Sequence, residues 1–586
     1  MSLFIELKRR NVIRMAGLYL VGAWVLVQVA STLFPSFGVP GWALRALVIV
    51  LALGFVPALV FAWVFELTPE GIKRDDQVPP EKSIAPQTAR RMDRMLITAL
   101  ALALIYFALD KFVLAPPRGP VAAIASTSTS ASADSSIAVL PFVDMSQGKD
   151  QEYFSDGLSE ELLNQLAQIP QLRVIARTSS FSFKGKEVGV ADIARILKVG
   201  HVLEGSVRKS GNTLRITAQL IRASDSSHLW SQTYDRDLTD VFKVQDEISR
   251  EVVTALKLQL LPGKRPDNTQ HTTDPAAYEQ YLIGKDVYRT GGRPSVEAAM
   301  AAFERAIAID PGYANAYAEL ANVKASMADF AENPAQREAV IEQALASADK
   351  AIALAPGLPD GYVWRGNIRH RMRWDWQGSQ ADLARALALD PNNAGALSSY
   401  GPILFSLGRR EEGIRVLRKA VASDPLSDAA WNTLARHQQQ AGALAEAKQA
   451  FERALEINPR QNWANFLLGN LLLAQGQTDL AISHYQLAPE QFRTAGMAMA
   501  EFTRGNEAAS KQALAKMEKD YATGFAFQIA QAYAWRGEKD QAFAWLDRAY
   551  AVHDGGLVRL SYDPGLDRLR DDPRFAALVR KMGFPK

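Results

Sequence analysis

The apolar positions between residues 428 and 459 recur every three or four residues, in two stretches separated by Ala441-Gly442. This spacing predicts two amphipathic helices, because side chains three and four positions apart share one helix face. Asn458-Pro459 predicts the end of the second helix, since proline has no N–H for the helical ladder. The predicted apolar faces carry Trp431, Leu434 and Ala435 in the first helix, and Ala447, Phe451 and Ala454 in the second.

The same two-helix pattern recurs along the chain. Pro391, Pro425 and Pro459 stand 34 residues apart, and each follows a similar helix end. Those ends read LARALALDP, LRKAVASDP and FERALEINP. A helix–turn–helix unit with this period resembles the tetratricopeptide repeat. The resemblance implies an all-α solenoid over residues 276–553 and a capping segment over residues 554–586. It also implies a scaffold that binds a protein or peptide partner in its groove.

Strand and helix patterns alternate between residues 137 and 260. Ile137–Phe142 and Leu172–Ala176 are predicted strands, and Tyr153–Ile169 is a predicted helix with leucines on one side. Three further strands with alternating apolar positions and two further helices complete the order β-α-β-α-β-β-β-α. This order predicts an α/β (α+β) module with its helices on one face of a sheet.

Three stretches of this module are similar to a known family: SIAVLPF, YFSDGLSEELLNQLAQIPQLRVIARTSSFSFKGK and HVLEGSVRKSGNTLRITAQLIRASDSSHLWSQTYDR. They resemble the FlgO-like, TolB N-terminal-like module of bacterial envelope proteins and of membrane-anchored tetratricopeptide repeat proteins. Some relatives carry an adenylate cyclase or a winged-helix domain ahead of a membrane span. We expect neither here, because the first apolar run starts near residue 12. The resemblance therefore implies no cyclase activity and no DNA binding.

The first 114 residues contain three apolar runs, at about 15–34, 43–65 and 95–114. Each has about 20 residues, the length that crosses a bilayer as a helix. Basic residues are concentrated before the first run and in the loop 67–94, which places both in the cytoplasm. We therefore expect three transmembrane helices in a bacterial inner membrane, with residues 115–586 in the periplasm. A Ser/Pro-rich linker is expected at 115–136 and a second linker at 261–275.

The composition mainly argues against certain kinds of site. The chain has no cysteine, which excludes disulfides and thiolate metal sites. Its formal net charge of +3 gives no reason to expect nucleic-acid binding. Its seven histidines show no metal-ligand spacing, and no nucleophile motif occurs. We expect no enzyme activity, no cofactor and no metal. The loop Arg177–Lys186 has two interpretations, an anion cradle or a structural loop with solvated cations.

One feature of the array is a candidate partner-binding site. Arg365, Arg369 and Arg373 recur at every fourth position of a predicted first helix, so their guanidinium groups share a face. They are expected either to clamp carboxylates of a partner or to form a solvated or locally paired face. Trp374 and Trp376 follow, as an aromatic anchor for a peptide or as filling between helices.

The sequence therefore predicts a non-enzymatic, membrane-anchored scaffold. A homo-oligomer formed through the apolar runs is also considered, because Gly17 and Gly22 give them small faces. The alternative is a sensory protein that passes an envelope signal to a cytoplasmic partner.

Overall fold

A computed structural model of the 586-residue chain separates it into two compact units, Met1–Ala125 and Ser126–Lys586. In the first unit the structure describes scattered residues between 15 and 30, and residues 41–68 and 71–74. In the second it describes residues 135–256 apart from 150, 170, 211–212 and 238–239, and residues 272 and 274–585 apart from 332.

The first unit contains the helix α3 (Gly41–Val64), whose 24 residues include Pro57. The described residues between 15 and 30 are also helical, and the Tyr19 hydroxyl donates to the Leu51 carbonyl oxygen at 2.8 Å. After α3 the chain forms a hairpin of β1 (Phe65–Thr68) and β2 (Gly71–Arg74). The sequence had predicted a helix end and a loop at this point, and the antiparallel pairing of Phe65 with Arg74 replaces them.

The described residues include no helix that is both long and apolar enough to cross a membrane. This finding overturns the predicted inner-membrane location with residues 115–586 in the periplasm, because that prediction rested on three membrane-crossing helices. The predicted span 95–114 lies outside the described residues, as do half of the span 15–34 and most of the loop 67–94. The linker at 115–136 also lies outside them except at its last two residues, where β3 begins.

The second unit begins with a mixed sheet whose main strand order is β5-β3-β6-β7-β8, with β4 paired to β6. The pairs of β3 with β5 and with β6 are parallel, and β6, β7 and β8 form an antiparallel meander. The strands are β3 (Ser136–Val139), β4 (Val143–Asp144), β5 (Arg173–Val174), β6 (His201–Ser210), β7 (Thr213–Arg222) and β8 (His228–Asp237). The helices of the module are α6 (Glu152–Ala167), α7 (Arg177–Phe181), α8 (Val190–Leu197) and α9 (Val241–Ala255).

The helices of this module cover both faces of the sheet, whereas the sequence predicted one face. Ile137 and Val139 of β3 join the core that contains α6 and α9. Ala138 of the same strand joins a second core with Ile193 and Leu197 of α8. Successive side chains of a strand point to opposite faces, so α8 lies opposite α6 and α9. β3 is apolar at every position after Ser136, so its sequence gives no alternation of apolar and polar residues. Such a strand is typical of a sheet that is covered on both faces.

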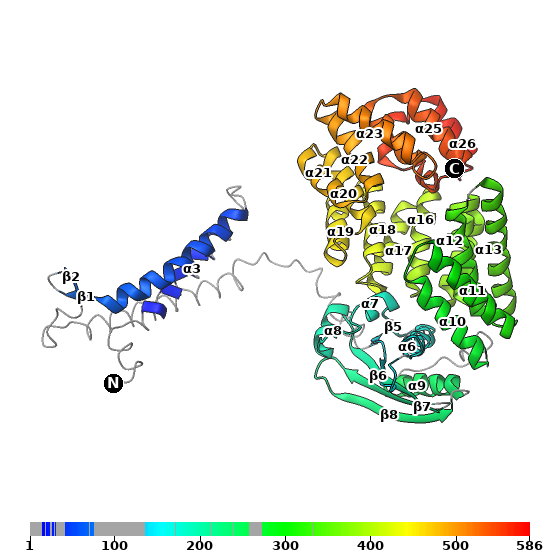
Figure 1. Ribbon diagram of the computed structural model, residues 1–586, viewed down its shortest axis with the longest axis horizontal. Helices are drawn as coiled ribbons and strands as arrows, with labels where there is room; N and C mark the ends of the chain where they lie inside the picture. The colour runs from blue at the N-terminus through cyan, green and yellow to red at the C-terminus, as the bar shows by residue number, and fades with distance from the viewer. Residues whose placement is uncertain are drawn as a thin grey trace, which may run out of the picture. The chain divides into compact units, whose positions relative to one another are not determined.

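Residues 275–551, apart from residue 332, form eight helix pairs of the predicted solenoid (Figure 1). The pairs are α10 (Pro275–Tyr288) with α11 (Arg293–Ile309), α12 (Ala314–Met327) with α13 (Pro334–Leu354), α14 (Pro359–Ile368) with α15 (Trp376–Leu389), α16 (Ala394–Ser406) with α17 (Arg410–Ser423), α18 (Asp428–Gln440) with α19 (Leu444–Ile457), α20 (Asn462–Ala474) with α21 (Thr478–Leu487), α22 (Glu490–Thr503) with α23 (Glu507–Asp520), and α24 (Ala526–Arg536) with α25 (Lys539–Ala551). The first helices of successive pairs pack side by side.

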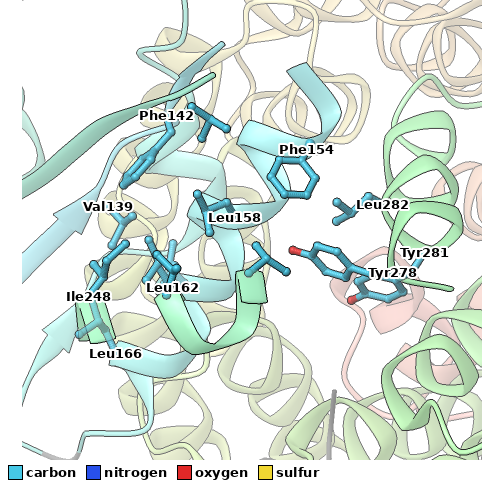
Figure 2. Packing of buried hydrophobic residues seen from close by; sticks show 14 of the residues in the cluster. Val139, Phe142, Phe154, Leu158, Leu162, Leu166, Ile248, Tyr278, Tyr281 and Leu282 are labelled. Atoms are coloured by element: carbon cyan, nitrogen blue, oxygen red, sulfur yellow. The ribbon is translucent and has the colours of Figure 1, made fainter. Parts of the chain in front are cut away.

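The module and the array share one hydrophobic core. Figure 2 shows Phe154 of α6 facing Tyr278 and Leu282 of α10, and the rings of Phe154 and Tyr278 meet edge to face with centroids 6.2 Å apart. A Cβ on Gly157 would come within 2.3 Å of Leu282, so only glycine permits this close approach of α6 to α10. The Lys285 ammonium also pairs with Glu160 at 2.5 Å. The first repeat pair is therefore fixed directly to the module.

The last segment consists of η8 (Gly555–Arg559), η9 (Pro564–Leu569) and α26 (Pro573–Lys581). The sequence predicted that it seals the last open face of the solenoid, and it does pack on α24 and α25. It also folds back onto the middle of the array, where Phe584 stacks on Trp376 with ring centroids 4.6 Å apart. Residues more than 200 positions apart in the sequence thus come into contact.

A candidate binding site on the inner face of the array

We call the surface formed by the first helices α14, α16, α18 and α20, together with the π-helical turn η7 (Arg369–Arg373), the inner face. A cavity of about 440 Å³ lies between this face and the segment 554–562 that folds back over it. Its lining comes from η7, α16, α18, α20, α24 and η8, and includes His370, Arg371, Ser398, Ser399, Thr433, Arg436, Trp463, Phe525, Gln528, Asp554, Arg559 and Tyr562. The volume lies in the range of small-ligand sites in proteins.

Two arginines dominate the electrostatics of this cavity. Arg559 is 6% exposed, and its guanidinium donates to Asp563 through Nε at 3.2 Å. Arg436 lies on α18, and its Nε is buried without a hydrogen-bond acceptor. Burial and the positive charge of Arg559 lower the pKa of Arg436 to about 10. Arg436 as a whole is half-buried. With Arg371 and Arg559 it outnumbers Asp554, the acidic residue of the lining, so the cavity has an excess of positive charge.

Two buried histidines beside the cavity remain neutral. Burial, together with the charges of Arg371 and Arg436, lowers the pKa of His370 to about 3. Burial also lowers the pKa of His437, again assisted by Arg436. Both imidazoles act as packing groups: His370 meets the ring of Trp376 edge-on at 5.5 Å, and His437 meets Phe405 at 4.5 Å. Since neither is charged near neutral pH, they add nothing to the positive charge of the arginines.

The three arginines predicted to clamp a partner are paired within the chain. Arg365 donates to the buried carboxylate of Asp382 through Nε at 2.9 Å, and Arg369 donates to the same carboxylate at 2.8 Å. Arg373 instead pairs with Glu338 and Glu342 of α13. Arg373 is separated from Arg365 and Arg369 because η7 is a π-helical turn. Such a turn changes the spacing of side chains that the prediction took from a regular α-helix. The clamp stays a prediction, and in this structure the arginines cross-link neighbouring helices.

The two tryptophans contact the returning C-terminal segment. Trp374 stacks on His553 with centroids 4.5 Å apart and planes 10° from parallel. Trp376 is 4% exposed, stacks on Phe584, and donates its indole N–H to the Met582 carbonyl oxygen at 3.1 Å. Their role as an anchor for a partner stays a prediction, and here the chain itself occupies the positions that such a partner would need.

The loop considered as an anion cradle has a structural role. Its first residues form α7, and Ser179 of that helix donates to Asp424 at the end of α17 through its backbone N–H at 3.0 Å and its hydroxyl at 2.5 Å. Lys184 of the same loop pairs with Asp156 of α6 at 2.7 Å. The loop therefore fixes the module to the middle of the array, in addition to the contact of α6 with α10.

No group of three or more His, Asp or Glu side chains that could hold a metal ion occurs among the described residues. The sequence did not single out Arg436 and Arg559, which come together from positions 123 residues apart. Arg436 stands on the first helix of its repeat, which marks it as an inner-face residue. Arg559 lies in a segment whose path over that face has no local signal in the sequence.

Comparison with known proteins agrees with the repeat assignment. Residues 375–428, 401–462 and 438–501 match tetratricopeptide repeat families. Residues 133–251 match the second domain of the HilA/YgeH-like transcriptional regulators. A curated relative, the putative adenylate cyclase 3 of Rhizobium meliloti (strain 1021), is 40% identical over 196 residues. That match covers 33% of each protein, so the chain spans about a third of the length of that relative.

Several solved structures are also similar. PilF of Pseudomonas aeruginosa is 20% identical with a TM-score of 0.30, covering 37% of this chain and 96% of that one. A thermophilic tetratricopeptide repeat protein of Thermus thermophilus is 21% identical with a TM-score of 0.29, covering 34% and 100%. A tetratricopeptide repeat protein from Parabacteroides merdae ATCC 43184 is 13% identical with a TM-score of 0.33, covering 47% and 100%. The family matches and the helix pairs together establish that the solenoid of this chain is built of tetratricopeptide repeats, beside a small mixed-sheet module.

Proposed function

We propose that this chain is a non-catalytic scaffold that binds a protein partner on the inner face of its repeat array. The observation that carries the proposal is the cavity between the inner face and segment 554–562, since it is concave, partly aromatic and positively charged. Tetratricopeptide repeats serve mainly as protein-interaction surfaces, and a solenoid offers many weak contacts along one face.

The module is proposed to act as a platform for the array. The sequence of the module resembles the FlgO-like and TolB N-terminal-like module, and its match to the second domain of HilA/YgeH-like regulators favours a regulatory role for the partner complex. Two separate contacts, α6 with α10 and α7 with the end of α17, hold the module against the array. The alternative proposal is a sensor. In it, a ligand or partner that shifts one of these two contacts would also shift the other, because both join the module to the array.

The proposal assigns no reaction to this chain. The relative named as a putative adenylate cyclase matches only in part, and its activity belongs to that protein. Formation of cyclic AMP from ATP by the purified full chain would contradict the proposal. We also propose that the full chain self-associates. A monomer in native mass spectrometry of the full chain would contradict self-association and would leave the scaffold function untouched.

The partner can be tested by site-specific photo-crosslinking in cells. A photoreactive amino acid at Ser399, which lines the cavity, should capture a partner that the same amino acid at the exposed Gln449 of α19 does not. The captured protein must then bind the purified chain. Ser399→Trp, which fills the cavity, should weaken that binding at least about tenfold, whereas Gln449→Trp should not. Equal capture at both positions, or undiminished binding by Ser399→Trp, would refute the inner face as the site.

A further inference from the structure

The cavity over the inner face brings together two arginines, Arg436 and Arg559, near the carboxylate of Asp563, which forms an ion pair with Arg559. Arg436 makes no ion pair or hydrogen bond with any described residue, and its Nε is fully enclosed. Arg559 has one carboxylate partner, Asp563, and otherwise lies over the rings of Phe527 and Trp463 at 5.1 and 5.8 Å. Its Nη groups therefore retain donors for a further acceptor.

The remaining charges of the lining do not change this balance. Arg371 adds a third cation at the rim, 59% exposed and 3.9 Å from Asp329. Asp554 is the acidic residue of the lining, and its carboxylate already accepts from the backbone N–H groups of Phe527 at 3.1 Å and Gly556 at 2.7 Å. Burial raises the pKa of Asp554. Its single negative charge is balanced by the positive charge of Arg371. The enclosed Nε of the half-buried Arg436 lacks an acceptor, and an anion that enters the cavity would supply one.

The rest of the lining suits a small molecule with a flat ring. Trp463, Phe525 and Tyr562 supply aromatic side chains, and Ser398, Ser399 and Thr433 supply hydroxyl groups. The inner face forms one wall of the cavity, and the segment 554–562 forms the other. About 440 Å³ between these two walls accommodates a small ligand.

We propose that this cavity binds a small organic anion, whose phosphate or carboxylate group is held by Arg436 and Arg559 and whose ring lies against Trp463 and Phe525. Phosphate and carboxylate share the acceptor geometry that two guanidinium groups recognise. The ligand would connect α18 with η8 and so stabilise the folded-back C-terminal segment over the inner face. This goes beyond the proposed scaffold function, because it gives the array a small-molecule ligand in addition to a protein partner.

The test uses thermal unfolding of the full chain in adenosine monophosphate, inorganic phosphate or citrate, with chloride of equal ionic strength as the reference. The midpoint should rise with at least one of the three anions, because a ligand that binds only the folded state stabilises it. A rise with either phosphate compound alone identifies phosphate as the recognised group, and a rise with citrate alone identifies carboxylate. Adenosine without its phosphate should give a smaller rise than the monophosphate.

Arg436→Gln should weaken the affinity for the effective anion at least about tenfold, as expected for the loss of one hydrogen-bonded charge. The variant should fold, since it loses an unpaired charge and no ion pair. Arg453→Gln is the matched control, because it removes one cation from the outer helix α19 of the same repeat, where Arg453 pairs with Glu456. No rise with any anion, an equal rise in Arg436→Gln, or an equal rise with adenosine would overturn the proposal. An acidic peptide that binds through Arg436 while all three anions fail would also overturn it, and would leave the scaffold function intact.

Discussion

Replacement of Trp376 by alanine distinguishes a structural role of this side chain from an anchor for a partner. Trp376 is 4% exposed at the start of α15, where its ring stacks on Phe584 and its N–H bonds to the Met582 carbonyl oxygen. Truncation of a buried tryptophan typically costs about 3–5 kcal/mol. Because these contacts join the middle of the array to the C-terminal segment, we expect the loss to fall mainly on the docking of that segment.

Two further variants separate the contributions of the hydrogen bond and of the ring stacking to this free-energy cost. Trp376→Phe keeps an aromatic ring but loses the hydrogen bond to Met582, which should cost about 1 kcal/mol in addition to any loss of packing. A double-mutant cycle of Trp376→Ala with Phe584→Ala should give a coupling free energy of about 0.5–1.5 kcal/mol, the value of a stacked aromatic pair.

Hydrogen exchange measured by mass spectrometry is the appropriate assay, since it reports local opening in an array that need not unfold as one unit. If docking loses about 3 kcal/mol, amides of α26 (Pro573–Lys581) should exchange about 100-fold faster in Trp376→Ala. Trp431→Ala is the control, because Trp431 bonds to the Pro425 carbonyl oxygen at 3.0 Å within its own repeat. Unchanged exchange of α26 in Trp376→Ala would refute the reasoning, and loss of a partner without that change would favour the anchor.

Three further predictions concern other parts of the second unit. Asp424→Ala removes the acceptor of two hydrogen bonds from Ser179, so it should lower the free energy of unfolding by about 2–3 kcal/mol in urea titrations; an unchanged midpoint would show that α7 is not held there. Burial raises the pKa of Asp390 to about 6, so the folded chain retains a proton there that the unfolded chain releases near pH 4. Stability should therefore fall by up to about 3 kcal/mol as the pH rises from about 4 to about 6, and Asp390→Asn should remove that part of the slope of the urea midpoint against pH. Gly205→Ala would place a Cβ 2.2 Å from the Thr217 carbonyl oxygen of β7, and we expect a loss of about 1–3 kcal/mol in thermal unfolding; a wild-type midpoint would mean that the strands separate without cost.

The local pattern of the sequence was sufficient for the repeats. The two helices expected around Ala441-Gly442 are α18 and α19, which end and begin on either side of that break. Each unit carries its own turn and its own apolar stripe, and these are properties of about 34 neighbouring residues. The strands of the module were recognisable for the same reason, because alternation along β7 is visible in the sequence without any partner.

Tertiary structure decided which side chains became available to a ligand. The spacing of Arg365 and Arg373 indicated a shared face, yet pairing with Asp382 in α15 and with Glu338 in α13 separates them. Arg436 carries no such partner among the described residues and ends beside Arg559 in a cavity. Whether an arginine is paired depends on carboxylates from other helices, and the sequence does not show which of these come within reach.

The sequence by itself determined the repeat, its period, and the order of strands and helices in the module apart from β4 and α7, because each of these depends on residues close together in the chain. Only the tertiary structure decided that α8 covers the second face of the sheet, that the module docks on both α10 and α17, and that the C-terminal segment returns to the inner face. These contacts join residues as far apart in the chain as Ser179 and Asp424. The contacts of the array with α7 and with the C-terminal segment follow from small rotations between successive helix pairs that add up along the array, and no single repeat encodes their sum.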